Sequence, residues 1–215
     1  VEVFKKVINS LKKNYEVTPI GGGVKKKGDL LIFNTYFYKK STLWLGTVSF
    51  GLFSFNSITK SFQQYTYRDI TKEDNTIFSI IQTALPGQED VLFFGATGVG
   101  LGAFNTVTKK ITSYSSGTYN TSLGIKGNVY GLRCYDNKLW IGSSTGLHCY
   151  DYSLQLFEKK DLSSIANGIT LLPTQLMAAE RSKTGKDERL WLFVPYKDAY
   201  IYDLVNDKIL PVPPA

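Results

Sequence analysis

Hydrophobic residues in this chain gather in short runs that alternate with segments rich in Gly, Asn, Asp and Ser. Runs rich in Phe, Tyr, Trp, Ile and Val between such turn-forming residues are typical of β-strands. Four runs share one pattern, with an aromatic residue in second place: Leu43–Thr47, Leu92–Ala96, Leu139–Ser143 and Leu190–Val194. Their aromatic residues, Trp44, Phe93, Trp140 and Trp191, are 49, 47 and 51 positions apart. The chain therefore carries an internal repeat.

Other landmarks keep the same register. A second aromatic residue follows the first by ten or eleven positions in every copy: Phe55, Phe104, Tyr150 and Tyr202. An apolar residue returns seven positions later: Phe62, Ile111, Phe157 and Ile209. Units of four antiparallel strands at a period of about 40–50 residues are the signature of β-propeller blades, which bury their faces against one another. The sequence predicts an all-β fold of such blades.

The third copy shows how one unit divides into four strands. We expect an inner strand at 128–135, a second at 138–143, a third at 146–151 and an outer one at 155–160. Asp136 and Asn137 suit a two-residue hairpin, because both residues tolerate positive φ. Gly142, which closes the second strand, is expected to give the backbone freedom beside a crowded turn.

The repeat divides the chain into an outer half-blade at 1–16 and four blades at 17–66, 67–115, 116–161 and 162–215. Phe4, Val7 and Leu11 keep the spacing of Phe55, Ile58 and Phe62, which favours a strand for the first segment. The same spacing also fits one face of an amphipathic helix. Four blades plus a surplus half-blade do not close into a ring by themselves. We expect a fragment of a larger propeller, or a segment that packs on a partner.

The segment Lys138–Asp151, with the sequence KLWIGSSTGLHCYD, carries the most specific motif. It resembles the two-component regulator propeller repeat, in which LWIGT is followed by GL and then YD. An Asn and an aliphatic strand precede that motif, as Asn75–Ile80 and Asn128–Leu132 do here. The last copy departs from the pattern, because Phe193 replaces the first Gly and Asp198 the second. Because of this departure, the pattern does not define the inner turns of the last blade.

The resemblance implies a function as well as a fold. Proteins with this repeat are commonly periplasmic sensor regions of hybrid two-component systems in Bacteroidetes-type bacteria, with seven blades per propeller, and respond to oligosaccharides from complex glycans. The same repeat occurs in propellers of secretion and cell-surface machinery. The resemblance therefore implies a periplasmic or cell-surface location. It also implies the rest of a propeller, a second propeller or a homodimer as partner.

Composition narrows the alternatives. The net charge is +7, but Lys is scattered over predicted turns and strand ends, where it solvates the backbone and protects sheet edges. Nucleic-acid binders concentrate such charge on one face, so we expect no nucleic-acid partner. No apolar run approaches the roughly 18–20 residues of a membrane span.

Candidate chemistry is sparse. His148 is the single histidine, and its repeat equivalents Phe53, Gly102 and Ile201 share no chemical theme, so we expect a structural role. Strand register places Cys134 opposite Leu139 and Cys149 opposite Trp140, too far apart for a disulfide, and predicts two free buried thiols. No metal spacing is present.

Two further patterns are also interpreted as structural. Gly21–Lys25 lacks the Gly-Lys-Ser/Thr ending of a phosphate loop, which favours a connection between blades. The acidic residues lie mostly at turns, and no pair suggests a glycosidase. We expect no catalytic residue, no metal and no cofactor.

A binding surface is better predicted from the connections between strands. Loops that share one rim of a propeller contain Tyr, Asn, Arg and Lys residues that suit stacking and planar hydrogen bonding to sugars. The ligand-binding candidates are Tyr67, Arg68, Tyr119, Asn120, Tyr196 and Lys197. The alternative is that these loops are only solvated. Arg133 on an inner strand is a further candidate for the axial channel, with its side not fixed by the pattern.

Three functions remain open at this point. The first is a non-catalytic propeller that senses an oligosaccharide or another small ligand for a signalling system. The second is a structural or interaction propeller of a secretion or surface complex. The least favoured is a propeller lyase or glycosidase.

Overall fold

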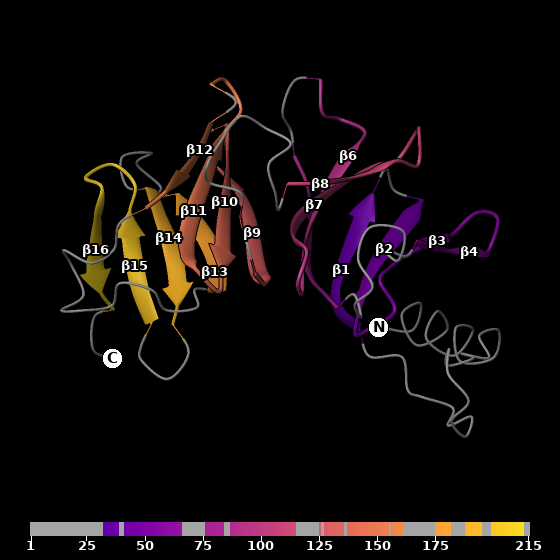
Figure 1. Ribbon diagram of the computed structural model, residues 1–215, viewed down its shortest axis with the longest axis horizontal. Helices are drawn as coiled ribbons and strands as arrows, with labels where there is room; N and C mark the ends of the chain where they lie inside the picture. Colours follow the sequence, from indigo (N-terminus) through magenta and orange to yellow (C-terminus); the bar gives the residue numbers. More distant parts are fainter. Residues whose placement is uncertain are drawn as a thin grey trace.

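In the computed structural model, the strands of the described residues form four antiparallel sheets of four strands each (Figure 1). The described residues are 32–38, 41–65, 76–83, 87–114, 125, 127–135, 137–154, 156–160, 175–181, 188–194 and 199–212. The predicted half-blade at 1–16 and the Gly21–Lys25 connection lie outside these ranges.

Each sheet takes its four strands in chain order, so neighbours in sequence are neighbours in space. The first sheet contains β1 (Ile32–Tyr38), β2 (Thr42–Thr47), β3 (Leu52–Asn56) and β4 (Ser61–Tyr65). The second contains β5 (Ile77–Gln82), β6 (Val91–Ala96), β7 (Gly100–Asn105) and β8 (Ile111–Ser113). The third contains β9 (Val129–Tyr135), β10 (Lys138–Ser143), β11 (Gly146–Asp151) and β12 (Leu156–Lys159). The fourth contains β13 (Gln175–Arg181), β14 (Glu188–Phe193), β15 (Ala199–Asp203) and β16 (Lys208–Pro211).

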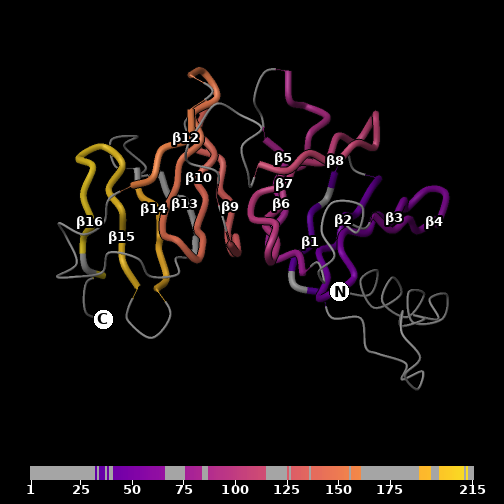
Figure 2. Tube along the Cα trace, in the orientation of Figure 1, coloured from indigo at the N-terminus to yellow at the C-terminus, as the bar shows by residue number. Residues whose placement is uncertain are grey.

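The four sheets stack face to face in a curved row. The first strands of consecutive sheets touch, β1 against β5, β5 against β9 and β9 against β13, while the outer strands fan away from them. Figures 1 and 2 show the first and the fourth sheets at opposite ends of this row. This arrangement is that of β-propeller blades, as the repeat predicts.

In the third sheet the strand predictions hold closely. The second and third strands match residue for residue, and the inner and outer strands differ by one residue at their ends. Asn137 has a φ of 54°, as a tight hairpin requires. Cys134 pairs with Leu139, and Trp140 pairs with Cys149, which confirms the predicted register.

Successive side chains of the second strand in each sheet point to opposite faces, and each face packs against a different neighbouring sheet. The aromatic landmark points toward the following sheet and its two flanking residues toward the preceding one. Trp44 accordingly packs in one cluster with Leu92 and Phe94, and Phe93 packs with Leu139 and Ile141. Trp140 packs in the same way with Leu190 and Leu192. The hydrophobic core is therefore a series of layers between sheets.

Glycine at the end of the second strand has a different role from the one expected. A Cβ on Gly46 would lie 2.9 Å from the Ile77 carbonyl oxygen, and one on Gly95 would lie 2.6 Å from that of Val129. Neither glycine has positive φ. The Gly is needed because the inner strand of the next sheet passes directly over it, not because the backbone bends there.

A recurrent carboxylate or amide fixes the turn between the third and fourth strands. In each sheet the side-chain Oδ1 of the residue after the second aromatic accepts the backbone N–H groups two and three positions later: Asn56, Asn105, Asp151 and Asp203. Asx turns of this kind satisfy backbone donors locally. They form a landmark of the repeat beside the aromatic ones.

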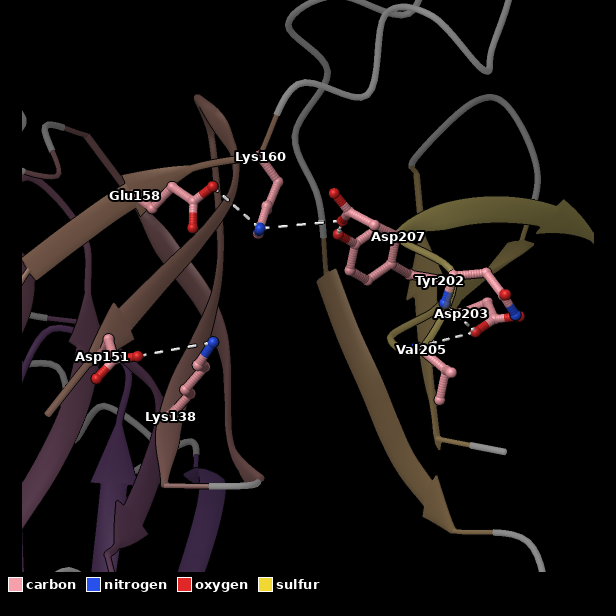
Figure 3. Close-up of polar contacts among 9 residues, drawn as sticks. Lys138, Asp151, Glu158, Lys160, Tyr202, Asp203, Val205 and Asp207 are labelled. Carbon is pink, nitrogen blue, oxygen red and sulfur yellow. Dashed lines mark hydrogen bonds and ion pairs between the residues drawn. The ribbon is translucent and has the colours of Figure 1, made fainter. Parts of the chain in front are cut away.

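An ion pair at the surface, between Lys160 and Asp207, also joins the third and fourth sheets. Tyr202 donates a hydrogen bond to Asp207, and Lys160 Nζ lies 3.9 Å from Asp207 Oδ1 and 3.0 Å from Glu158 Oε1 (Figure 3). Exposed ion pairs contribute little, so the apolar layer around Trp140 provides most of the stabilisation.

Candidate functional site

The six residues predicted to bind ligand, Tyr67, Arg68, Tyr119, Asn120, Tyr196 and Lys197, lie outside the described residues. Their role stays a prediction. Arg133 lies on β9 opposite Trp140, on the face turned toward the fourth sheet. Its guanidinium donates to the Leu132 carbonyl oxygen at 2.7 Å, and burial lowers its pKa.

The groups with nucleophilic potential are held in unreactive forms. His148 is buried and lies 3.0 Å from the Thr145 hydroxyl. Burial, with the nearby charge of Lys159, lowers the pKa of His148 to about 4, so the ring is neutral at pH 7. Cys134 and Cys149 are free, as predicted, but only Cys149 is fully buried, whereas Cys134 is half-buried. Burial raises the pKa of each thiol to about 11. A thiol with such a pKa is a poor nucleophile.

The described residues contain neither a cluster of metal ligands nor a membrane-spanning helix. No group of three or more His, Cys, Asp or Glu side chains in these ranges is placed to hold a metal ion. None of the described segments forms a helix long and apolar enough to span a membrane.

A cavity of about 340 Å³ lies between the first and second sheets. The first sheet contributes two rows of neighbouring residues on its facing side, which are Trp44, Ser54 and Gln63 in one row and Thr42, Asn56 and Ser61 in the other. The second sheet contributes Asp90 and the turn between β7 and β8, with Thr106, Val107 and Lys109. Tyr38 and Tyr65 complete the lining. The cavity is therefore polar along both sheets and aromatic on one side.

The aromatic side is a close-packed group of three rings. Trp44 lies 5.1 Å from Phe104 and 5.5 Å from Tyr65, and Tyr65 lies 4.6 Å from Phe104, measured between ring centroids. Lys109 Nζ lies 6.0 Å from the centroid of Phe104. Because each ring is braced by the other two, the aromatic side of the cavity is preformed. Its accessible surface belongs mainly to the half-buried Tyr65, since Trp44 is almost wholly buried.

Hydrogen bonds of Tyr38 connect the first and second sheets beside the cavity. The Tyr38 hydroxyl donates to Asp90 Oδ1 at 2.9 Å and lies 3.2 Å from the Thr106 hydroxyl. Thr106 donates from its backbone N–H and its hydroxyl to the Asp90 carbonyl oxygen, at 2.7 and 3.0 Å. These contacts fix the distance between the sheets at this point.

One polar group of the lining has no partner. Trp44 is only 2% exposed, and its indole Nε1 makes no hydrogen bond within the part of the chain that the structure describes. A buried donor without an acceptor costs about 1–3 kcal/mol. The nitrogen itself is buried, so a water or a ligand oxygen in the cavity would reach it only after a small shift of the neighbouring side chains. Sequence reasoning missed this site because its residues come from two blades, and the repeat marks Trp44 as a packing residue.

Comparisons with known proteins show similarity in structure and not in sequence. No family model matches the chain, and no curated protein does. The extracellular domain of BT4673 from B. thetaiotaomicron, assigned to a hybrid two-component system, superposes with a TM-score of 0.62 at 16% identity. The match covers 86% of this chain and 22% of that one.

Two other solved structures give similar results. An auxiliary nutrient binding protein from Bacteroides thetaiotaomicron matches with a TM-score of 0.57 at 11% identity, over 84% of this chain and 40% of that one. PorZ, a surface component of the type-IX secretion system of Porphyromonas gingivalis, matches with a TM-score of 0.54 at 15% identity. That match covers 87% of this chain and 27% of PorZ. This chain thus spans less than half the length of each. The shared property is the fold.

Proposed function

We propose that this chain is part of an extracytoplasmic propeller that senses a ligand for a two-component signalling system. The observation that carries the proposal is the fold likeness to an extracellular domain assigned to such a system, which covers 86% of the chain. The motif in Lys138–Asp151, which resembles the two-component regulator propeller repeat, supports it independently. The proposed location is periplasmic or at the cell surface.

The proposed ligand is an oligosaccharide derived from a glycan. Sugars are recognised by aromatic rings that stack on their apolar faces and by amide, hydroxyl and charged groups that bond their hydroxyls. The loop candidates Tyr67, Arg68, Tyr119 and Asn120 offer these groups in sequence. The likeness in fold to an auxiliary nutrient binding protein supports a ligand of this kind.

The proposed mechanism is a change in packing and not a reaction. The layers between sheets are dense, so a ligand that bridges two blades biases their relative position. The rest of the propeller, a second propeller or a second copy of the chain would transmit that change. The neutral His148 and the protonated thiols fit a site without catalysis.

A second candidate function is that of a structural propeller in a secretion or surface complex. The likeness to PorZ favours it. A docking or sorting domain in the full-length protein would support this function, whereas an immunoglobulin-like domain and a membrane helix would support the sensor.

A binding screen with product analysis tests the proposal. The chain is titrated calorimetrically with a panel of plant and host oligosaccharides, and each mixture is analysed afterwards by mass spectrometry. We expect binding of at least one oligosaccharide with no change in its mass. Binding of none would contradict the sensor, and cleavage would contradict the non-catalytic role.

A further inference from the structure

We propose that the cavity between the first and second sheets binds one pyranose-sized, uncharged sugar ring. This inference rests on the proposed function for its ligand class, but it assigns a site that the loop candidates do not include. The cavity lies beside the turns that follow β1 and β3. The six loop candidates are not among its lining residues and lie outside the described residues.

The size and shape of the cavity fit a small ligand. Sites for small molecules have volumes of about 300–1,000 Å³. At about 340 Å³ this cavity is at the lower end of that range. A single ring, or the terminal unit of a longer chain that continues into solvent, would occupy it.

The aromatic side suits the apolar face of a sugar ring. Trp44 and Tyr65 both line the cavity and are braced against Phe104 from behind. The C–H groups of a pyranose pack against such rings with little loss of side-chain entropy, since the rings are already fixed.

The polar groups of the lining suit hydroxyls. Trp44 Nε1 is a buried donor without a protein acceptor. Asn56 uses its Oδ1 for the backbone N–H groups of Ile58 and Thr59, which orients its Nδ2 as a fixed donor. Gln63 and Ser54 add an amide and a hydroxyl in the row of Trp44. A ring with several hydroxyls can satisfy this mixture of donors and acceptors.

The charges favour an uncharged ligand over an anion or a cation. One carboxylate, Asp90, and one ammonium, Lys109, both line the cavity. A charged ligand would be attracted by one and repelled by the other. The hydroxyls of a neutral sugar can donate to Asp90 and accept from Lys109.

The next interface shows that this space is not required by the fold. Tyr152 occupies in the third sheet the position of Thr106 in the second, immediately after the third strand. Its ring lies 5.9 Å from that of Phe93, which is the repeat equivalent of Trp44. A large side chain therefore fills the second interface at the point where the first is open.

Calorimetric titration with free hexoses tests the site. The probes are D-glucose, D-galactose, D-mannose and the oligosaccharides that bind in the screen. Thr106→Tyr places in the cavity the side chain that fills the next interface, and we expect at least a tenfold loss of affinity. Thr108→Tyr, at an exposed position of the same turn, is the matched control and should bind like the wild type.

A second variant removes only the orphan donor. Trp44→Phe keeps a ring, as Phe93 does in the next sheet, and should weaken hexose binding about fivefold, the factor for one hydrogen bond of about 1 kcal/mol. Trp140→Phe removes another unpartnered indole donor, in the interface between the third and fourth sheets. It should leave binding unchanged, and thermal melting checks that each variant is folded.

The outcomes separate the two proposals. Hexose binding that both cavity variants weaken supports the site. Oligosaccharide binding that neither variant changes overturns the site and leaves the sensing function intact. An absence of binding by the wild type to hexoses and oligosaccharides alike overturns both.

Discussion

The first and second inter-sheet interfaces are built from the same repeat, yet one contains a cavity and the other is filled. At the first, a tyrosine on the inner strand, Tyr38, meets a threonine after the third strand, Thr106. At the second, the repeat equivalents are exchanged, with Thr83 after the inner strand and Tyr152 after the third strand. Because Tyr152 enters from the opposite side, its ring reaches the aromatic landmark Phe93 and occupies the space.

The comparison shows that the backbone repeat and the binding capacity are specified separately. Aromatic landmarks, the Gly before the turn and the Asx turns recur and fix the stacking of sheets. The residues that decide whether space remains between two sheets differ from copy to copy. In the row of Trp44 the first sheet has Ser54, and the second sheet has Ala103 at the same position. The same stacking of sheets thus leaves room for a cavity at the interface between the first and second sheets.

The largest expected effect comes from the close approach that both interfaces share. Gly95→Ala should reduce the free energy of unfolding by about 3 kcal/mol, because its Cβ would lie 2.5 Å from Val129 Cγ1 and 2.6 Å from the Val129 carbonyl oxygen. Gly46→Ala should cost less, about 2 kcal/mol, since the corresponding distances to Ile77 are 2.9 Å. Urea unfolding measures both. Phe193→Ala, at the equivalent and exposed position of the fourth sheet, is the control; equal costs for all three would contradict the close approach.

Acid should weaken the second interface selectively. His148 faces the second sheet beside Ile141, and the equivalent residue at the first interface is Gly102. The folded pKa of His148, about 4, lies below its ordinary value of 6.5. Its neutral form therefore contributes stability that is complete above pH 6.5 and is lost as the pH falls toward 4, by up to about 3 kcal/mol.

Urea unfolding from pH 7.5 to 4.5, for the wild type and His148→Gln, isolates this contribution from that of the carboxylates. We expect a steeper fall in the wild type. Parallel curves would show that His148 is solvated in the folded state.

Removal of the ring that fills the second interface should lower the free energy of unfolding more than truncation of Thr106 at the first. Tyr152→Ala removes a half-buried ring that packs on Phe93 and Tyr150, and should destabilise by about 2 kcal/mol. Thr106→Ala should cost about 1 kcal/mol, mainly the hydrogen bond from the Thr106 hydroxyl to the Asp90 carbonyl oxygen. Chemical unfolding of both variants makes the comparison. A smaller loss for Tyr152→Ala than for Thr106→Ala would mean that the second interface is not filled by this ring.

The smallest effect is expected at the orphan donor. Trp44→Phe should change the free energy of unfolding by less than about 1 kcal/mol, because removal of the unsatisfied buried N–H offsets part of the packing that the smaller ring loses. Tyr38→Phe, which loses the bond to Asp90, should cost about 1 kcal/mol. Thermal and urea unfolding at pH 7.5 measure the pair, and a larger cost for Trp44→Phe than for Tyr38→Phe would contradict this ranking.

Much of the fold follows from the sequence, because a repeat supplies several independent readings of one structure. The aromatic landmarks predicted the second strands, and the turn residues predicted the ends of β10 and β11 to the residue. The role of Gly95 could not be read in the same way, since a contact with Val129 joins separate copies. The Asx turns at Asn56 and Asn105 were visible as a recurring Asn or Asp, but only the hydrogen bonds reveal their function.

The cavity was beyond sequence reasoning for the same reason. Its lining joins residues from two copies, such as Gln63 and Lys109, and each alone resembles an ordinary surface residue. The exchange of Tyr38 and Thr106 for Thr83 and Tyr152 becomes visible only when the sheets are stacked. Packing between copies, and not the pattern within a copy, creates the candidate site.

A crystal structure of the chain soaked in a hexose tests the central claim most directly. We predict a sugar ring in the cavity between the first and second sheets, in contact with Tyr65, while the ring of Tyr152 fills the equivalent space against Phe93. A cavity that stays free of sugar at a saturating hexose concentration would contradict the account.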